Sequence, residues 1–477
     1  MRPIAPTLAL LGLLAGCTVG PNYAGPPKSA TQTTAFARAG DAASATAPVA
    51  RWWEALGDPV LNDLVARTLA ANPNVAAAQA RLRQARAALR VERANELPNI
   101  SGTGSYAHAH LPGIDFGSSD NGGSGNSGGG STDLDVYNVG FDASWEIDIF
   151  GGQRRAIQAA RATAEVAEAN IADTQVSLSA EVVQAYVNLR DRQRRINLGN
   201  NSIAMQEQML ELTRQRLGRG TASQLDVTRL ENQLDNSRAE ITPLHAEAEA
   251  YLDELATLTG QAPGALDATL TPVKPLPLPP AEVAVGDPAA LLQRRPDIRA
   301  AERTLAADTA KIGQAEAARF PKVSFMGLIG VGGSDISDLT KLDDFVALVA
   351  PQISWDFLDF GRNAAKVRQA EGVRDEAEAK YRATVLAALR DAEDSLSRFR
   401  YGRITVATRA RAKAEADLAL QLSEQRYRAG TTTLIDLLDA RRQQIAAEQN
   451  LSIAEAGLTG DFVAIQKALG LGWAPPA

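Results

Sequence analysis

The motif Trp145-Glu-Ile-Asp-Ile-Phe-Gly151 returns 210 residues later as Trp355-Asp-Phe-Leu-Asp-Phe-Gly361, and this repetition decides the fold. At the same offset, Arg216-Leu-Gly-Arg-Gly-Thr-Ala-Ser-Gln-Leu-Asp226 returns as Arg426-Tyr-Arg-Ala-Gly-Thr-Thr-Thr-Leu-Ile-Asp436. Two different motifs that recur at one spacing indicate a tandem duplication, which has to be recognised before any local pattern is interpreted.

A second offset, of 223 residues, relates Leu97-Pro-Asn-Ile to Phe320-Pro-Lys-Val. The offsets differ because the first half carries an extra Gly/Ser-rich stretch at 117–131, for which we expect a flexible loop facing the outside of the cell. We place the first repeat at 58–259 and the second at 297–470.

The amino terminus indicates export. Arg2 is followed by an apolar run, 4–14, which is too short to span a bilayer and ends shortly before Cys17. Residues 1–16 resemble a bacterial lipoprotein signal, after which Cys17 would be acylated; the alternative is an ordinary signal peptide with a chance cysteine. Cys17 is the only cysteine of the chain, and acylation would account for an otherwise odd thiol. The following Thr18, in place of Asp, favours sorting to the outer membrane.

Composition excludes some classes of partner. The formal net charge is −7 and the pI is near 5.3, with no basic block, so we expect no nucleic-acid partner. The sequence has no run of 18 or more apolar residues, so any passage through a membrane would have to use β-strands.

Long helices are predicted from two stretches without proline, 113–242 and 352–474. In the first stretch, apolar residues recur every seven positions at Val182, Leu189, Ile196, Ile203, Leu210 and Leu217. Such spacing is typical of helices packed as coiled coils, and 66 residues at 1.5 Å each would span roughly 100 Å. Pro243 predicts a kink. We expect helices at 152–217, 222–259, 362–428 and 432–469.

Four strands are predicted from alternating apolar and polar residues, at 100–110, 136–147, 323–331 and 345–357. About ten residues suffice for a tilted membrane strand. Alternation alone would equally describe the edge of a soluble sheet. The aromatic clusters that include Trp145, Phe150, Trp355 and Phe360 favour a membrane, because they resemble an interfacial girdle.

Four strands cannot close a barrel, and an open sheet edge is not tolerated in lipid. Two chains would supply eight strands, whose barrel is filled by its own side chains, whereas three would supply twelve and leave a lumen. We therefore expect a mostly α-helical protein with a membrane β-barrel, in which a homotrimer completes twelve strands and an α-helical barrel continues them.

These features together resemble the TolC-type outer-membrane efflux family, and within it the lipidated branch of resistance-nodulation-division systems. The resemblance rests on Cys17-Thr-Val-Gly-Pro-Asn-Tyr23, on Trp52-Trp53, and on the duplicated strand ends and helix turns. It implies a trimeric duct that docks a periplasmic adaptor (a membrane fusion protein) and an inner-membrane transporter. Small molecules would pass unchanged, with no catalytic residues and no cofactor beyond the lipid on Cys17.

The resemblance also implies a gate at the periplasmic mouth. Asp436 and Asp439 match acidic positions that ring the mouth in the family, and Ile435 matches a bulky apolar position that narrows it. Asp226 lies at the corresponding place in the first repeat, and Tyr427 matches an aromatic residue that helps to hold the gate closed.

Three aspartates that converge on a narrow pore would repel one another and attract cations. The alternative for either aspartate is a solvated carboxylate at a helix start, favoured by the helix dipole. Some family members carry Arg where this chain has Thr432, so we expect no Arg–Asp bridge from that position to Asp226. The sequence leaves open whether Arg441 or Arg442 replaces it.

The turns between paired helices contain Gly-Thr in both repeats. Gly220 and Gly430 are expected to adopt the left-handed backbone that ends a helix, and Thr221 and Thr431 are expected to cap the helix that follows. The resemblance implies that these turns contact the adaptor. A plain helical-hairpin turn is the alternative, and both can hold together.

The remaining segments are expected to be irregular. Residues 260–296 contain eight prolines and predict an equatorial linker without helix or strand. Residues 17–57 are expected to form the lipid anchor and an extended tether, and 471–477 a tail.

Enzymatic function is not expected. His108 and His110 are spaced for metal binding, but no further ligands complete a site in the sequence nearby, and no phosphate loop or nucleophile elbow is present. A lipid-anchored periplasmic coiled-coil structural or adaptor protein without a pore is the alternative function. It does not explain four strands ending in aromatic clusters. The exported compound and the particular pump cannot be read from the sequence.

Overall fold

The computed structural model describes residues 18–27, 35–41, 43–44, 46–112, 131–340, 343 and 345–473. The predicted signal peptide, the acylated Cys17 and nearly all of the loop 117–131 lie outside these residues, so those predictions remain untested.

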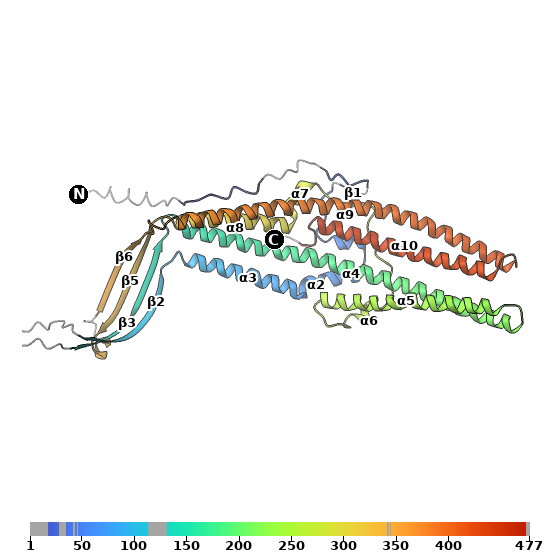
Figure 1. The fold of residues 1–477 in the computed structure, drawn as a ribbon, viewed down its shortest axis with the longest axis horizontal. Coiled ribbons are helices and arrows are strands. Elements are labelled where there is room, and N and C mark those ends of the chain that lie inside the picture. The colour runs from blue at the N-terminus through green and yellow to red at the C-terminus, as the bar shows by residue number, and fades with distance from the viewer. Residues whose placement is uncertain are drawn as a thin grey trace, which may run out of the picture. The chain divides into compact units, whose positions relative to one another are not determined.

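The chain forms two compact units. One, which we call the strand unit, comprises Met1–Pro26, Arg83–Ala164 and Arg303–Glu378; the other, the helical unit, comprises Pro27–Leu82, Glu165–Glu302 and Ala379–Ala477. Each unit takes segments from both sequence repeats, so the units do not follow the repeat boundaries. The reason is that α4 (Gly152–Gly218) and α9 (Arg362–Arg428), of 67 residues each, contribute to both units (Figure 1).

The strand unit contains one antiparallel sheet with the order β2-β3-β5-β6 (Figure 1). Its strands are β2 (Asn99–Pro112), β3 (Ser131–Ile147), β5 (Lys322–Gly333) and β6 (Phe345–Ser354). The four predicted strands are thus confirmed, although β3 starts earlier and β6 ends earlier than predicted. A short 3₁₀ helix, η2 (Ile336–Thr340), lies between β5 and β6.

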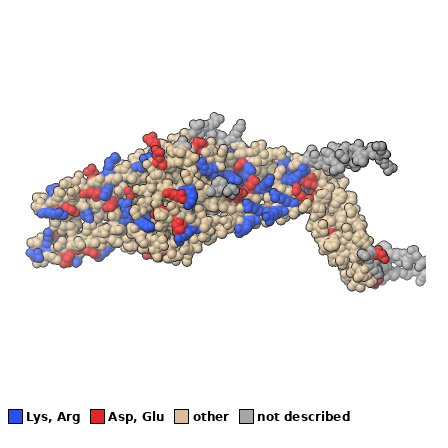
Figure 2. Space-filling view, turned by 180° about the vertical axis from the view of Figure 1, so that it is seen from behind, with Lys and Arg blue, Asp and Glu red and all other residues tan. Residues whose placement is uncertain are grey.

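The two faces of this sheet differ in polarity. One face carries large apolar side chains that remain exposed, including Phe141 (65%) and Val349 (72%). The other carries polar residues such as Thr103 and its neighbour Asp142. Figure 2 shows few charged side chains on the strand surface that faces the viewer. An exposed apolar face of this extent marks a surface that contacts lipid or another protein.

Aromatic residues mark the end of the sheet from which α4 and α9 depart. Trp145 Nε1 donates to the Glu96 carbonyl (2.9 Å), and Trp355 Nε1 donates to the Arg319 carbonyl (3.1 Å). The two repeats differ at the phenylalanine that follows each tryptophan motif. Phe150 stacks on Phe320 with ring centroids 4.6 Å apart, whereas its counterpart Phe360 is 92% exposed and has a φ of +52°. Phe360 is the only non-glycine residue in the described part of the chain with a positive φ.

Residues 18–23 pack against α4 and α8 (Pro296–Ala317) in the strand unit. The Arg155 side chain, 2% exposed, donates to the carbonyls of Val19 (3.1 Å) and Gly20 (2.9 Å). Gly20 lies so close to Gly313 that a Cβ on Gly20 would stand 2.4 Å from the Gly313 Cα. The start of the predicted tether is therefore a fixed part of the fold, held by a buried guanidinium and a close backbone approach.

Replacing Gly313 by Ala should destabilise this packing, because its Cβ would lie 2.7 Å from Arg155 Nε. Overpacking of this kind costs about 1–3 kcal/mol. Gly372→Ala is the matched control, since a Cβ there meets nothing within 4 Å in α9, and removing a helical glycine adds about 0.5–1 kcal/mol of stability. Thermal unfolding in detergent should show a lower Tm for Gly313→Ala alone. Equal Tm values for the two variants would contradict the packing described.

The helical unit packs two helical hairpins and an amino-terminal cap around one core. The hairpins are α4 with α5 (Gln224–Leu258) and α9 with α10 (Leu434–Ala468). The cap comprises η1 (Trp52–Leu56), α2 (Pro59–Ala71) and the start of α3 (Pro73–Ala94). The Trp52 and Phe462 rings meet edge to face, with centroids 5.8 Å apart. The predicted coiled-coil positions do pack, since Leu210 is buried against Val227, Leu230 and Leu234.

Two segments expected to be irregular contain short elements. The linker 260–296 contains α6 (Asp267–Leu270), β4 (Val283–Ala284) and α7 (Pro288–Arg294), so the prediction of no helix or strand was wrong. Proline is compatible with α7 because Pro288 occupies its first turn, where an N–H is not needed.

The predicted tether is not wholly extended either, because η1 lies within it, and its strand part is fastened to the helical unit. In the helical unit, β1 (Ala43–Ser44) pairs in parallel with β4, and Phe36 is buried. The backbone N–H groups of Ala37 and Arg38 each donate to the Glu393 carboxylate at 2.8 Å. The tail is also partly packed, since Leu471 is only 3% exposed. Helix α5 continues through Pro243, so the proline at which a kink is predicted does not end the helix.

Candidate functional site

The helical hairpins end in two nearly identical turns. Gly220 and Gly430 have φ values of +71° and +73°, which confirms the predicted left-handed backbone. In each turn the next residue closes the preceding helix. Thr221 donates its N–H (2.9 Å) and its hydroxyl (3.1 Å) to the Arg216 carbonyl, and Thr431 makes the same two contacts with Arg426. Both contacts satisfy carbonyls that the helix end leaves free.

The helix caps lie two residues further along than predicted. Ser223 and Thr433, and not Thr221 and Thr431, are the N-cap residues of α5 and α10. The prediction failed because the threonine after each glycine is already engaged with the helix that it follows. The pattern Ser-x-x-Asp or Thr-x-x-Asp before an apolar run was present in the sequence and would have located both caps.

Both candidate gate aspartates that follow these caps belong to capping boxes. Asp436 Oδ2 accepts from the Thr433 N–H (3.1 Å), the Thr433 hydroxyl (2.7 Å) and the Thr432 hydroxyl (2.9 Å). Asp226 accepts in the same way from Ser223. The hydroxyl of Thr433 and then its N–H hold the pKa of Asp436 below its ordinary value of 3.8, and Ser223 lowers the pKa of Asp226 likewise. These carboxylates start helices and stay ionised near neutral pH; their role in a gate remains a prediction.

Asp439 has a cationic partner in its own helix. Arg442 Nη2 lies 2.6 Å from Asp439 Oδ1, and Gln443 donates to the other carboxylate oxygen at 2.7 Å. Arg441 instead donates to the thioether sulfur of Met205 at 2.8 Å. Of the two arginines considered as replacements for the missing gate arginine, Arg442 is therefore the one that pairs with a candidate gate aspartate.

Tyr427 joins the two repeats near the turns. The guanidinium of Arg216 lies over its ring, 5.9 Å from the centroid, so the ends of α4 and α9 are in contact. Such a contact is worth about 0.5–1 kcal/mol at an exposed site. Ile435 is 48% exposed in the single chain.

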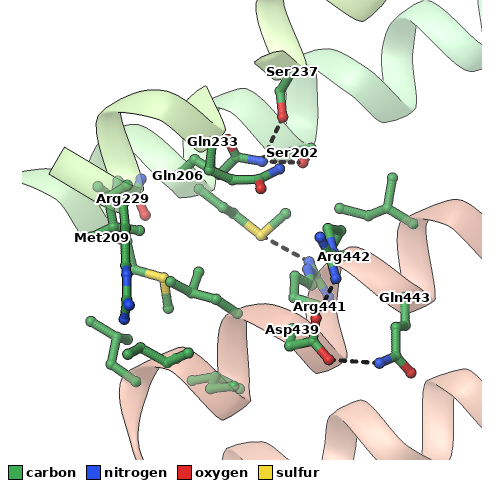
Figure 3. Close-up of a pocket in the computed structure, with 18 of the residues that line it drawn as sticks. Ser202, Gln206, Met209, Arg229, Gln233, Ser237, Asp439, Arg441, Arg442 and Gln443 are labelled. Carbon is green, nitrogen blue, oxygen red and sulfur yellow. Dashed lines mark hydrogen bonds and ion pairs between the residues drawn. The ribbon is translucent and has the colours of Figure 1, made fainter. Parts of the chain in front are cut away.

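A cavity of about 1200 Å³ lies between the hairpins close to these turns (Figure 3). Three predicted gate residues line it, namely Asp226, Ile435 and Asp439. On one wall, the Gln206 amide donates to the hydroxyls of Ser202 and Ser237, each at 3.0 Å, and on the other the Asp439–Arg442 pair is visible (Figure 3).

Away from the turns, the same hairpins are fastened together. Arg194 of α4 pairs with Glu455 of α10 at 2.6 Å, and the Ser452 hydroxyl donates to the buried Asp191 carboxylate at 2.8 Å. The hairpins are therefore joined firmly at one level and separated by open space at another.

His108 lies on β2, where its Nδ1 is 2.9 Å from Asp135 Oδ1 in β3. The Tyr106 hydroxyl donates to the same oxygen at 3.0 Å. Within the residues described, no group of three or more His, Cys, Asp or Glu side chains is arranged to hold a metal ion. None of the described helices is both long and apolar enough to cross a membrane.

The fold and the paired turns define a class of protein, the efflux channels of the outer membrane. The family model described as "Outer membrane efflux protein" matches residues 64–261 and 288–471, and the chain belongs to this family. Nodulation protein T of Rhizobium leguminosarum bv. trifolii is 29% identical over 469 residues, covering 98% of this chain and 96% of that protein.

Two further comparisons agree. The pyoverdine export outer membrane protein OpmQ of Pseudomonas aeruginosa is 31% identical over 434 residues, covering 89% of this chain and 88% of that protein. The solved structure of the outer-membrane channel OprN superposes with a TM-score of 0.86 at 35% identity, covering 96% of this chain and all of that one. The chain is accordingly an outer-membrane channel component of an efflux system.

Replacing Thr433 by Ala should loosen the start of α10, because it removes the hydroxyl that caps it. A lost N-cap costs about 1 kcal/mol, or roughly a fivefold rise in local opening. Hydrogen exchange of the first turn of α10 measures this. Thr431→Ala is the control, and its effect should fall on the last turn of α9. Faster exchange at α10 in the control but not in Thr433→Ala would restore the original assignment.

Protection of these helix starts should also depend on pH. Because the folded pKa of Asp226 and Asp436 lies below the unfolded one, their contribution is present above pH 3.8 and is lost as the pH falls through the folded pKa. Hydrogen exchange, corrected for intrinsic rates, should show constant protection from pH 7 to about 5 and a loss below about 4. Asp436→Asn should flatten this dependence in α10 alone; an unchanged profile would contradict it.

Proposed function

We propose that three copies of the chain form the exit duct of a tripartite efflux system. Twelve strands would form a barrel in the outer membrane, and the long helices would continue it as a tube into the periplasm. The duct would pass small molecules, such as drugs or other toxic compounds, without chemical change. The inner-membrane transporter, of the resistance-nodulation-division class, and a periplasmic adaptor would deliver them.

One observation carries this proposal. The sheet β2-β3-β5-β6 has two edge strands and a largely exposed apolar face, a combination that a single chain cannot stabilise in water or in lipid. Adding further copies pairs the edges, and lipid covers the apolar face. The coiled-coil structural protein considered as the alternative needs helices only, and leaves this sheet without a purpose.

The adaptor would meet the turns at Gly220-Thr221 and Gly430-Thr431, and the periplasmic gate would lie just beyond them. Three copies of Asp436 near a common axis would place ionised carboxylates around the mouth, where they would favour cations. Asp439 would add less charge because Arg442 lies beside it. Ile435 would narrow the opening, and the contact between Tyr427 and Arg216 would hold the hairpins in the closed arrangement.

The double variant Asp436→Ala, Asp439→Ala should loosen the closed mouth, because it removes both carboxylates that follow the turn. Single-channel recordings in planar bilayers should show a small, cation-selective conductance for the wild type and a larger, less selective one for the variant. Of the single variants, Asp436→Ala should change the selectivity more. Asp63→Ala is the control, since Asp63 forms an exposed ion pair with Arg67 within α2. Equal conductance in all variants would leave the duct in place and refute the gate.

The lipid on Cys17 would anchor the chain, and the barrel would hold it independently. Cys17→Ala, exported with an ordinary signal peptide, should therefore still fractionate with outer membranes and need detergent for extraction. Release of Cys17→Ala by alkaline carbonate without detergent would contradict a membrane barrel and favour the lipid-anchored alternative.

A further inference from the structure

The cavity between the helical hairpins has the size of a small-molecule site. Its volume of about 1200 Å³ lies within one chain and is lined by residues of α4, α5, α9 and α10. A helix is about 10–12 Å wide and rises about 5.4 Å per turn, so this volume would hold only about two turns of helix. Pockets that bind drug-sized molecules measure about 300–1,000 Å³. The cavity is therefore better matched to a compact ligand than to a helix of another protein.

Most of the wall surface that a ligand would meet is apolar. Side chains from all four helices contribute to it, namely Met209, Leu212, Ile241, Leu420, Leu434 and Leu438. Leu212 is 58% exposed in the single chain, so it stabilises the fold little and offers its surface to the cavity. Covering apolar surface of this kind with the body of a ligand is favourable in water.

Arg441 of α10 brings a poorly satisfied positive charge into this apolar surrounding. Its Nη2 donates to the thioether sulfur of Met205, a weak acceptor, and its Nε is buried without a hydrogen-bond partner among the described residues. Asp417 of α9 feels the charge of Arg441 but is held by Lys413 at 2.6 Å and by Gln444 at 3.0 Å. Arg441 therefore lacks the carboxylate that a partly buried guanidinium normally has.

The carboxylates that line the cavity are better satisfied. Asp439 accepts from Arg442 and Gln443, and Asp226 accepts from its capping Ser223. Glu424 lies 4.0 Å from Arg428, and the fourth, Glu240, is exposed to water, which screens its charge. The unmet electrostatic demand of the cavity is therefore for an anion, and it is located at Arg441.

We propose that the cavity binds an amphipathic organic anion. Its carboxylate, sulfonate or phosphate group pairs with Arg441 in place of the Met205 sulfur, and its apolar body covers Met209 and Leu212. This site goes beyond the proposed gate and does not depend on it, because it is built from one chain and uses none of the aspartates.

The wall opposite Arg441 adds a polar contact (Figure 3). There the Gln206 side chain is fixed by its amide, which donates to Ser202 and Ser237 at 3.0 Å each. The three residues form a polar strip that faces Arg441 across the cavity (Figure 3). The ligand therefore has an apolar body with a polar group at either end, and the charged group lies at the α10 wall.

Two fluorescent probes with the same rings test this assignment. Anilinonaphthalene sulfonate carries one negative charge, and phenylnaphthylamine is the same molecule without the sulfonate. The full protein in nanodiscs of zwitterionic lipid is titrated with each probe, and the signal of empty nanodiscs is subtracted. The wild type should bind both, and Arg441→Gln should weaken the sulfonate about tenfold, as expected for a charged hydrogen bond, without changing the uncharged probe.

Arg441→Lys keeps the charge and should retain most of the affinity for the sulfonate. Arg411→Gln is the matched control, since it removes an exposed charge of α9 that does not line the cavity and should change neither probe. No binding above empty nanodiscs would overturn the site. Equal sulfonate affinity in Arg441→Gln and the wild type, or an equal loss in Arg411→Gln, would overturn the role of Arg441.

The apolar part of the site has a separate variant. Leu212→Ala removes exposed apolar surface from the cavity wall, so it should weaken both probes alike, by roughly threefold. Leu422→Ala is its control, because Leu422 of α9 is similarly exposed at 50% but lies outside the cavity. Unchanged binding in Leu212→Ala, or the same loss in Leu422→Ala, would show that the probes bind elsewhere and would contradict the proposed site.

Discussion

The unpaired backbone at the two edges of the four-stranded sheet is the constraint on which the rest of the structure depends. A strand edge presents N–H and C=O groups that water can satisfy but lipid cannot. The sheet order leaves β2 and β6 at the edges, and its apolar face is exposed along most of its length. In the proposed trimer, pairing between copies would satisfy these edges, and the duct would follow from that pairing.

The helical hairpins differ from the sheet, because their backbone N–H and C=O groups are hydrogen-bonded within the chain. Each turn ends one helix through Thr221 or Thr431 and starts the next through a Ser or Thr cap with an aspartate three residues on. The aspartates thereby combine two roles. Their hydrogen bonds stabilise the helix start, and their charge stays available at the tip. The hairpins are fastened by the pair of Arg194 and Glu455, and a cavity lies between them near the turns.

Much of this architecture could be predicted from the sequence, because each main helix and strand has a counterpart in the other repeat that shows the same pattern. The boundaries of α4 and α9 were predicted within about one residue, since absence of proline and apolar spacing act over many residues.

Hydrogen bonds and ion pairs between polar side chains were harder to predict from the sequence. The caps at Ser223 and Thr433 were missed although their pattern was present, and the pairing of Asp439 with Arg442 was left open. The clamp of Arg155 on Val19 and Gly20 joins residues about 135 positions apart, and no local pattern reports such a contact. Short elements in 260–296 were missed because proline was read as excluding helix, whereas Pro288 begins one.

If copies of one chain close a barrel through their strand edges, the barrel fixes the number of copies in the particle. Native mass spectrometry of the protein released from a mild detergent counts the copies without relying on shape. A twelve-stranded barrel predicts a single species of three chains, each close to the 50.5 kDa of the full sequence less its signal peptide and plus its lipid. A dimer would indicate an eight-stranded barrel without a lumen, and a monomer that stays folded in detergent would show that the sheet edges need no partner. Either result would contradict the account.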